Sequence, residues 1–320
     1  MQDIRAVISS ELESVDQLIV EQLHSDVPLV EDIGHYIVEA GGKRMRPTLV
    51  LLAAKALGYD GRLSIQLATA IEYIHTATLL HDDVVDISML RRGRPTANAQ
   101  WGNAPSVLVG DFIYSRAFQM LVAMNDMPIM ALLATTTNKI AEGEVLQLQK
   151  AGDPTTTEEE YLTVIKNKTA ILFEASSLGG AMIAGASPTQ CEALRTFGSA
   201  LGTAFQLIDD VLDYQGKAEE MGKNIGDDLA EGKPTLPLIY TMRQNNQEQA
   251  TIVEQAIRNK SSEQLSQIIE AVSSNGALEY THSCAVKEQE RAIRALEHLP
   301  DNEATRQMAR LAHLAVNRRA

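Results

Sequence analysis

The sequence has few aromatic residues and almost no cysteine. Phe, Trp and Tyr together make up 4% of the 320 residues, and Cys191 and Cys284 are the two cysteines. Two cysteines are too few for a disulfide framework or a cysteine-based zinc site. We therefore expect both to be ordinary thiols and the fold to be held by packing alone.

Long apolar runs and an excess of positive charge are also missing. No stretch approaches the roughly 18 uninterrupted apolar residues of a membrane-spanning helix, and acidic residues interrupt the N-terminal segment where a signal peptide has its apolar core. With 28 Lys and Arg against 42 Asp and Glu, the net charge is −14, which disfavours nucleic-acid partners. We expect a cytoplasmic protein without a transmembrane segment.

Alternating β-branched runs and Pro/Ser/Gly-rich linkers are absent as well. Instead, apolar residues recur three and four positions apart, which is typical of amphipathic helices. Capping-box pairs predict helix starts at Thr157, Ser187 and Ser261. We predict an all-α fold without significant sheet, in which residues 1–320 form a single large helical bundle. The helical periodicity is clearest in Ile4–Leu23, Ile33–Val38, Leu63–Leu80, Phe112–Met124, Ile129–Leu148 and Leu162–Ile183.

Two aspartate clusters stand out in this helical pattern. The segment ATLLHDDVVD (77–86) resembles AFQLIDDVLD (204–213), and each contains Asp-Asp-x-x-Asp. On a helix this spacing gathers carboxylates along one edge, where they repel one another unless a cation lies between them. The carboxylates are Asp82, Asp83 and Asp86 in the first cluster and Asp209, Asp210 and Asp213 in the second.

Carboxylate clusters of this kind suit Mg²⁺, which prefers one or two carboxylates together with phosphate oxygens. The alternative is a solvated acidic helix face. Apolar pairs precede both clusters, Leu79-Leu80 and Leu207-Ile208, and a solvated face would not be so embedded. We therefore predict two Mg²⁺ sites that a substrate diphosphate completes.

Basic residues are grouped near these clusters. GGKRMRP (41–47) places three cations beside a flexible glycine pair, and RRGRP (91–95) follows the first cluster after a short loop. Arginine binds phosphate oxygens in bidentate fashion, and glycine lets backbone amides approach them. Further basic candidates are Lys166, Lys168 with Thr169, Lys223 and Lys233.

The histidines and the candidate nucleophiles give weaker evidence about function than the charged motifs do. His75 precedes Asp82 by seven residues and so lies on the same helix face. A lone histidine is more often a satisfied core residue than a ligand, and we expect His81 to be a hydrogen-bond partner or a spectator. No Ser–His–Asp or Cys–His arrangement is discernible, which argues against nucleophilic catalysis.

Together these motifs resemble the trans-type (E-type) isoprenyl diphosphate synthases, and specifically the bacterial long-chain group typified by octaprenyl diphosphate synthase. The matching motifs, in chain order, are GGKRMRP, LLHDDVVD, RRGRPT, Gly110-Asp111, Lys168–Ala170, FQLIDDVLD and GDDLAEGKPTLP.

The resemblance implies an all-helical fold around a central cavity and a homodimer. It implies that Asp82, Asp86 and Asp209 hold Mg²⁺ while the other three aspartates assist. Isopentenyl diphosphate would be bound by Lys43, Arg46, His75 and Arg92. The allylic diphosphate would be bound by Arg91, Lys168, Thr169 and Gln206, with Lys223 and Lys233 helping to neutralise the leaving group.

The reaction implied is sequential condensation of isopentenyl diphosphate onto an allylic diphosphate, with farnesyl diphosphate the expected primer. Ala77 and Thr78 lie about one helical turn before Asp82, where bulky aromatics block the cavity in short-chain members of the family. Their small size predicts a long product, octaprenyl or alternatively nonaprenyl diphosphate, for quinone side chains. The product would pass to membrane enzymes.

Three other readings remain open from the sequence. A terpene cyclase would share the helices and one aspartate motif but needs no second diphosphate site. A non-catalytic partner subunit would be expected to lack some of the charged residues, and none is missing here. A shorter-chain prenyltransferase would share all of the charged motifs.

Overall fold

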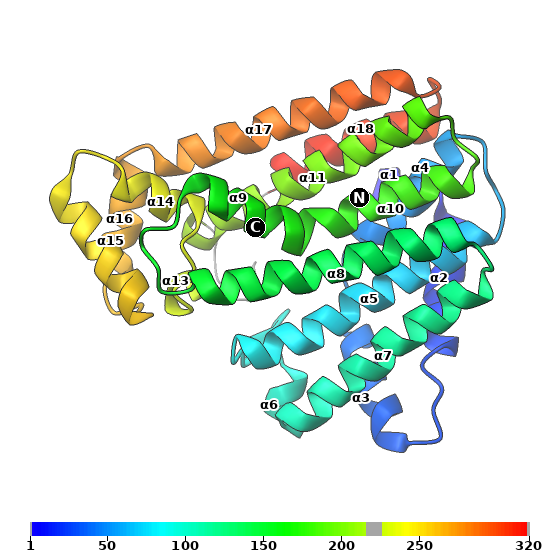
Figure 1. Ribbon diagram of the computed structural model, residues 1–320, viewed down its shortest axis with the longest axis horizontal. Helices are drawn as coiled ribbons and strands as arrows, with labels where there is room; N and C mark the ends of the chain where they lie inside the picture. Colours follow the sequence, from blue (N-terminus) through cyan, green and yellow to red (C-terminus); the bar gives the residue numbers. More distant parts are fainter. Residues whose placement is uncertain (1, 216–225, 319–320) are drawn as a thin grey trace. The chain divides into compact units, whose positions relative to one another are not determined.

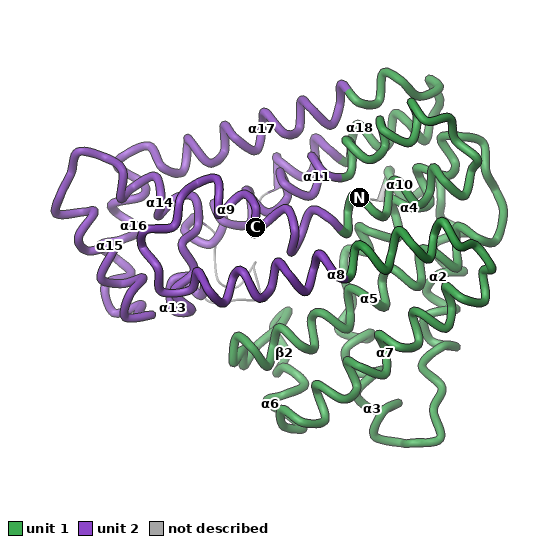
Figure 2. The backbone as a smooth tube through the Cα atoms, in the orientation of Figure 1, with its two compact units in different colours: residues 1–137, 172–198, 295–311 green, residues 138–171, 199–294, 312–320 purple. Residues whose placement is uncertain are grey.

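The computed structural model describes residues 2–215 and 226–318. Helices make up nearly all of its regular structure, as the periodicity predicted (Figure 1). The chain forms two compact units (Figure 2). Unit 1 comprises residues 1–137, 172–198 and 295–311, and unit 2 comprises residues 138–171, 199–294 and 312–320. Because each unit draws on three separate segments, no single cut divides them, and the single-domain interpretation stays a prediction.

Unit 1 is built around one helix that is apolar on nearly every side, which favours complete burial. This helix, α5 (Leu63–Val85), packs against α2, α4 and α7, and the Tyr73 hydroxyl donates a 2.6 Å hydrogen bond to the Ile19 carbonyl of α2. The helices of unit 1 are α1 (Gln2–Ala6), α2 (Ser9–Glu21), α3 (Pro28–Glu39), α4 (Met45–Ala56), α5, α6 (Ala97–Trp101), α7 (Asn103–Ala123), the first part of α8 (Met127–Lys150), nearly all of α10 (Ile171–Ile183), the start of α11 (Pro188–Gln215), the 3₁₀ turn η2 (Leu296–His298) and most of α18 (Glu303–Val316).

The strands of the described residues form one minimal hairpin after α5. Strands β1 (Leu90–Arg91) and β2 (Arg94–Pro95) pair antiparallel. Arg92 and Gly93 form the two-residue turn, with φ values of 53° and 74°, as the tight turns of such hairpins require. The prediction of no significant sheet is confirmed, and the turn places Arg92 at the hairpin tip.

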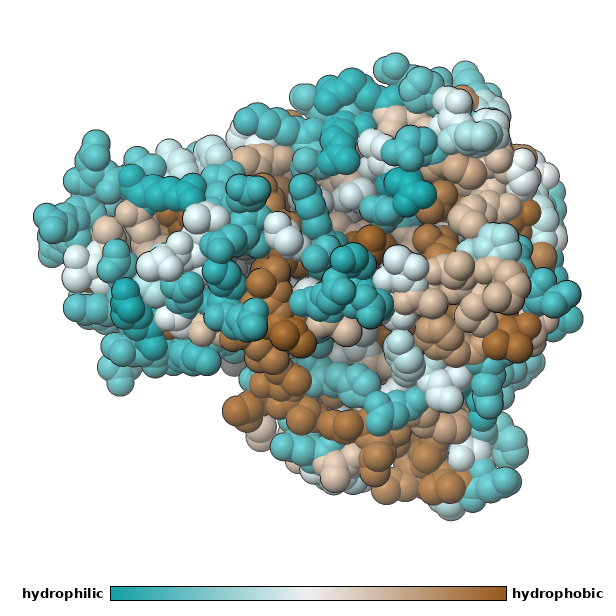
Figure 3. All heavy atoms as spheres, in the orientation of Figure 1, coloured by the Kyte–Doolittle hydropathy of each residue, from teal (hydrophilic) through white to brown (hydrophobic). Residues whose placement is uncertain are grey.

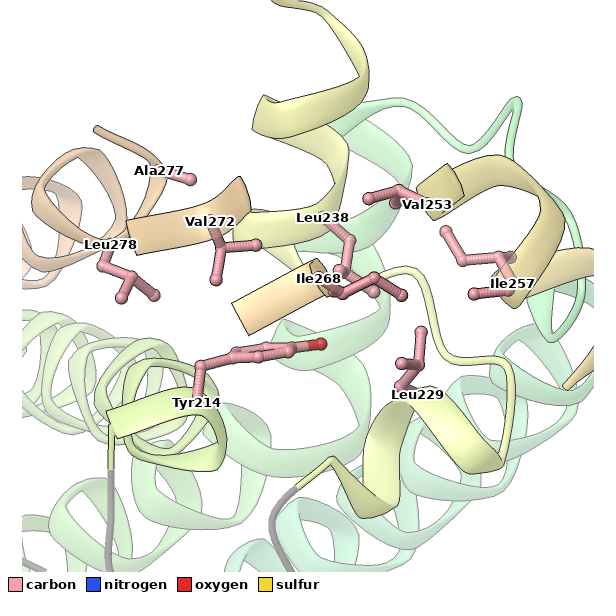
Figure 4. Packing of buried hydrophobic residues seen from close by; sticks show 10 residues of the cluster. Tyr214, Leu229, Leu238, Val253, Ile257, Ile268, Val272, Ala277 and Leu278 are labelled. Carbon is pink, nitrogen blue, oxygen red and sulfur yellow. The ribbon is translucent and has the colours of Figure 1, made fainter. Parts of the chain in front are cut away.

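Unit 2 has its own cores. One gathers Leu238, Val253, Ile268 and Val272 around the ring of Tyr214 (Figure 4). Its helices are the second half of α8, α9 (Glu158–Ile165), the π-helix η1 (Lys166–Ala170), most of α11, α13 (Asp227–Ala230), α14 (Leu236–Met242), α15 (Gln247–Asn259), α16 (Leu265–Ser274), α17 (Ala277–Ala295) and the end of α18.

Two of the three predicted capping boxes are present. Thr157 caps α9 reciprocally with Glu160, and Ser187 exchanges hydrogen bonds with Gln190 at the start of α11. The prediction at Ser261 is wrong. Its hydroxyl accepts from the Glu263 amide instead, in a local turn, and α16 begins four residues later at Leu265.

No helix in the described part of the chain combines the length and the apolar character needed to cross a bilayer.

Candidate active site

The first aspartate cluster lies at the C-terminal end of α5 in unit 1. The three carboxylates do not share one environment: Asp82 and Asp86 are half-buried, whereas Asp83 is completely buried. Asp86 ends the helix, and its amide donates to the Asp82 carbonyl. The buried member therefore has a different role from the two that reach the surface.

Asp83 is bound by Arg91 of the hairpin that follows. Arg91 donates from Nε and Nη2 to Asp83 Oδ1 at 2.8 and 2.6 Å, a fork geometry that strengthens the pair. The side-chain amide of Asn98 donates to the carbonyls of Asp83 and Ser88, both at 3.2 Å. These contacts attach the RRGRP hairpin to the helix end that carries the acidic cluster.

His81 links α5 to α7. Its Nε2 lies 3.2 Å from both the Val107 carbonyl and Asp111 Oδ1. A Cβ at Gly110 would lie 2.5 Å from the same ring nitrogen, so glycine at this position leaves room for the imidazole. The predicted Gly110-Asp111 motif therefore accommodates and orients His81, which is a hydrogen-bond partner, as expected.

The GGKRMRP segment meets the hairpin at Gly42. A Cβ at Gly42 would lie 3.0 Å from Nη2 of Arg92, so the missing side chain lets the guanidinium rest against the backbone. Arg46 stacks over the Phe173 ring at 4.5 Å, and Lys43 is exposed. The two basic motifs, about fifty residues apart in sequence, thus form one surface.

The charges of four arginines act on the half-buried ring of His75. Burial, and then the charges of Arg46, Arg92, Arg91 and Arg44, lower the pKa of His75 well below its usual value. The ring is therefore neutral at physiological pH and can offer a hydrogen bond without adding charge. Three members of the predicted isopentenyl diphosphate set, Arg46, His75 and Arg92, are brought together in unit 1. We call the site formed by Lys43, Arg46, His75 and Arg92 the cation cradle.

The second aspartate cluster lies near the end of α11 in unit 2. Asp209 is 43% exposed and forms a 2.8 Å ion pair with Arg318, whereas Asp210 and Asp213 are buried. Arg318 is held further by the Phe205 carbonyl and stacks on the Phe205 ring. As in the first cluster, the first aspartate of the motif reaches the surface and the second is enclosed.

Asp210 is enclosed by hydrogen-bonding side chains. The Tyr161 hydroxyl contacts Asp210 Oδ2, and the Gln206 amide donates to Oδ1 at 2.9 Å. Burial, followed by the charge of Asp228, raises the pKa of Asp210 to about 8. In the metal-free protein this carboxyl is therefore largely protonated near neutral pH.

The predicted Lys168 and Thr169 lie in the π-helix η1, a rare element that often marks functional positions. Lys168 Nζ forms a 2.8 Å ion pair with Glu144, and the Thr169 hydroxyl contacts Gln206 Oε1 at 3.1 Å. Gly143 permits this approach, because a Cβ there would lie 2.7 Å from the Lys168 amide nitrogen. Thr169, Gln206 and Asp210 thus form one hydrogen-bonded chain.

The structure says less about the two remaining predicted cations, Lys223 and Lys233. Lys233 forms an ion pair with Glu231, and Lys223 falls outside the described residues. Within residues 2–215 and 226–318, no three His, Cys, Asp or Glu side chains converge as a metal cage. The donor set still fits Mg²⁺, because that ion takes one or two carboxylates and fills its other positions with water and phosphate oxygens.

Sequence reasoning missed several partners of the predicted residues. Glu72 and Glu144 hold basic residues, Tyr161 binds Asp210, and Arg318 pairs with Asp209. None of the four lies within the aspartate clusters or the grouped basic motifs of the sequence. The only available signal was a charged residue within an otherwise apolar segment, as for Glu72 in AIEYIH.

Comparison with known proteins now decides the family. The model of the polyprenyl synthetase family matches residues 27–273. The chain belongs to the polyprenyl synthetase family. It is 49% identical to octaprenyl diphosphate synthase of Escherichia coli (strain K12) and 50% identical to the all-trans-nonaprenyl-diphosphate synthase (geranyl-diphosphate specific) of Rhodobacter capsulatus, with 99% of this chain covered in both cases and 99% and 98% of the relatives.

The fold agrees with this assignment. A crystal structure of a polyprenyl synthase from Caulobacter crescentus CB15, complexed with calcium and isoprenyl diphosphate, matches with a TM-score of 0.96. The two chains are 43% identical, and the match covers 99% of this chain and 97% of that one. The resemblance to E-type isoprenyl diphosphate synthases and the all-α prediction are both confirmed.

The different environments of Asp82 and Asp83 predict different mutant phenotypes. Asp83→Asn should lower stability by about 3 kcal/mol, because it leaves the Arg91 guanidinium beside a neutral group in a buried pair. Asp82→Asn should leave the melting temperature nearly unchanged but reduce turnover by roughly a thousandfold, which is the effect expected from its predicted role as a metal ligand. Thermal melting by circular dichroism and prenyl-transfer rates check this. Equal losses of stability in both variants would refute the division.

The raised pKa of Asp210 predicts a stability that depends on pH. A carboxyl with a folded pKa near 8 and an unfolded pKa near 3.8 stabilises the fold fully only at low pH, and this contribution is lost as pH rises toward 8. Asp210→Asn, which mimics the protonated form, should therefore stabilise the metal-free protein more at pH 8.5 than at pH 5. Melting temperatures in a chelator measure this, and a difference that is independent of pH would contradict it.

Proposed function

We propose that the chain is a long-chain trans-polyprenyl diphosphate synthase that adds isopentenyl diphosphate units to an allylic diphosphate. The observation that carries this proposal is the arrangement around His75, where arginines of two basic motifs converge beside a helix that ends in half-buried carboxylates. A diphosphate-binding surface next to metal-type carboxylates is what prenyl transfer requires. Membership of the polyprenyl synthetase family supports it.

In this proposal the cation cradle binds isopentenyl diphosphate. Arg46 and Arg92 supply planar guanidinium groups that can grip phosphate oxygens in pairs, and exposed Lys43 adds a mobile charge. Neutral His75 donates or accepts a hydrogen bond between them. The cradle holds the substrate so that its double bond, rather than its diphosphate, reaches the reacting carbon.

The allylic diphosphate is assigned to the carboxylate clusters and to the residues of η1. We propose that Asp82, Asp86 and Asp209 are the residues that would hold Mg²⁺, because they are the half-buried members of their clusters. Bound Mg²⁺ would offset the charge that grows on the leaving diphosphate. Arg91, Lys168, Thr169, Gln206, Lys223 and Lys233 are proposed to orient that group, while Asp83, Asp210 and Asp213 support the ligand-bearing helices.

The reaction then needs little from the protein as acid or base. The allylic C–O bond breaks with both electrons on oxygen, and the isopentenyl double bond supplies the electrons of the new C–C bond. The released diphosphate takes the proton that is lost as the new double bond forms. Apolar surroundings exclude water, which would otherwise quench the allylic cation.

We propose octaprenyl diphosphate as the product and farnesyl diphosphate as the primer, with nonaprenyl diphosphate as the alternative. Small residues precede Asp82 by one helical turn. Ala77 is fully buried, and Thr78 is half-buried with its hydroxyl on the His75 carbonyl at 2.8 Å. Relatives of both product lengths are similar to this chain, the octaprenyl synthase of E. coli at 49% identity and the nonaprenyl synthase of R. capsulatus at 50%.

We also propose a cytoplasmic homodimer that passes its product to membrane enzymes of quinone biosynthesis. Apolar side chains are exposed along α7 and at the start of α8, with Leu108, Val122 and Met127 each more than 60% accessible (Figure 3). Leu108 and Val122 lie about four helical turns apart on one face. Analytical ultracentrifugation should give a mass twice that of one chain, which is 34.9 kDa.

Turnover by the purified chain tests the proposal. Incubation with farnesyl diphosphate, isopentenyl diphosphate and Mg²⁺ should yield polyprenyl diphosphates, chiefly octaprenyl by mass spectrometry, and a chelator should abolish the reaction. Product formation without isopentenyl diphosphate would indicate a terpene cyclase. Inactivity of the folded single chain would indicate a partner subunit.

The proposed division of basic residues predicts selective effects on KM. Arg46→Ala should raise the KM for isopentenyl diphosphate about 10- to 100-fold, because a partly desolvated phosphate contact is lost. Lys168→Ala should have a comparable effect on the allylic KM. Steady-state kinetics with each substrate varied in turn measure both, and identical effects of the two variants on both substrates would refute the assignment.

Product length should respond to the residues one turn below Asp82. Ala77→Tyr should stop elongation at about three or four isoprene units, because an aromatic ring fills the space below the diphosphate. If the buried site does not tolerate tyrosine, Thr78→Phe is expected to have the same effect. Thr78→Val is the size-matched control and should keep the long product. The apolar segment Phe118–Met124 is proposed as the cavity floor. Chromatography of dephosphorylated products gives the answer, and unchanged lengths from folded, active Ala77→Tyr and Thr78→Phe enzymes would overturn the prediction.

A further inference from the structure

Arg44 of the GGKRMRP segment is held by two carboxylates. Its side chain is only 15% exposed, and it forms ion pairs with Glu72 (Nη1 to Oε1, 2.9 Å) and Asp16 (Nε to Oδ1, 3.0 Å). Glu72 is 7% exposed and Asp16 is 57% exposed. The pair with Glu72 is therefore the enclosed one, and Arg44 is turned away from solvent while Lys43 faces it.

The backbone of Arg44 is also unusual. Its φ of +41° places it in the left-handed region, which L-residues other than glycine rarely adopt. Arg44 is the N-cap residue that precedes α4, and its carbonyl accepts from the Thr48 amide at 3.0 Å. The direction in which α4 leaves the segment, and with it the position of Arg46, depends on this left-handed turn being held.

Glu72 reaches a second loop of the cradle as well. It lies on α5 one turn before His75, which places both residues on the same side of the helix. Burial lowers the pKa of Arg92, and the charge of Glu72 opposes that effect. One buried carboxylate thus attracts cations of both basic motifs, which already meet where Arg92 rests against Gly42.

We propose that the Arg44–Glu72 pair is a positioning device that sets the cation cradle in its binding geometry before isopentenyl diphosphate arrives. The proposal rests on the proposed function of the cradle. Arg44 does not bind the diphosphate in this account. Arg44 forms an ion pair with Glu72, and this pair fixes the left-handed turn that places Arg46.

A simple count of charges makes the opposite prediction. Glu72 is an anion close to a site for a dianionic or trianionic group, so its removal should strengthen diphosphate binding through reduced repulsion. Positioning predicts weaker binding instead, because the turn at Arg44 loses its anchor and the cradle must be ordered when substrate binds. The sign of the change in diphosphate affinity therefore distinguishes positioning from charge repulsion.

The test is Glu72→Gln, a variant that keeps the shape of the side chain. The KM for isopentenyl diphosphate should rise about tenfold, equivalent to about 1.4 kcal/mol, while kcat and the allylic KM stay within about twofold. Asp16→Asn is the matched control, because it removes the exposed partner of the same arginine, and every parameter should stay within about twofold. If Glu72→Gln melts too early for kinetics, Glu72→Asp serves, with a smaller rise in the same KM.

Direct binding provides a second readout. Calorimetric titration of the metal-free protein with isopentenyl diphosphate should show the same tenfold weakening in Glu72→Gln. Adding Arg44→Gly should recover most of the affinity, because glycine adopts the left-handed turn without an anchor. Unchanged or tighter binding by Glu72→Gln, or no recovery in the double variant, overturns the positioning role.

The same experiments distinguish a failure of the proposed function from a failure of the Arg44–Glu72 positioning role. If the wild-type protein neither binds nor consumes isopentenyl diphosphate, the proposed function is wrong. If wild type does both and Arg46→Ala is impaired, but Glu72→Gln binds as well as wild type, only the positioning pair is wrong.

Discussion

The ion pair between buried Asp83 and Arg91 fixes the end of α5 to the hairpin that follows it, and the cradle depends on that attachment. Arginines gathered at half-buried positions repel one another unless carboxylates offset them. Asp83 does this for Arg91, and Glu72 does it for Arg44. The cations that support the site therefore have counterions within the fold, and Arg46 and Arg92 belong with a neutral histidine to the cation cradle.

The same division appears in unit 2, around different residues. Asp210 is enclosed by hydrogen bonds and its pKa is raised to about 8, whereas Asp209 stays half-exposed and pairs with Arg318. In each Asp-Asp-x-x-Asp motif the first aspartate is accessible and the second is buried. A helix end embedded in apolar sequence can carry adjacent carboxylates because the buried one is compensated within the fold, by Arg91 at Asp83 and by hydrogen bonds from Tyr161 and Gln206 at Asp210.

This internal pairing marks the limit of what the sequence could predict. Helical periodicity identified the fold, and the spacing of the aspartates identified the motifs, because both are local properties of the chain. The partner of Arg44 lies 28 residues away and that of Asp209 lies 109 residues away, near the chain end. Only the folded chain separates a structural cation from a ligand. The π-helix that presents Lys168 likewise packs closely against Gly143, a contact that no local pattern signals.

The two diphosphates are proposed to be bound by different means, isopentenyl diphosphate by cations alone and the allylic diphosphate through metal. Calorimetric titration of the chelator-treated protein tests this proposal most directly. Isopentenyl diphosphate should bind without metal, with a Kd in the micromolar range. That Kd corresponds to a binding free energy of about −8 kcal/mol. A non-hydrolysable thio analogue of farnesyl diphosphate should bind only after Mg²⁺ is added. Isopentenyl diphosphate binding that requires Mg²⁺, or analogue binding that is indifferent to it, would contradict the account.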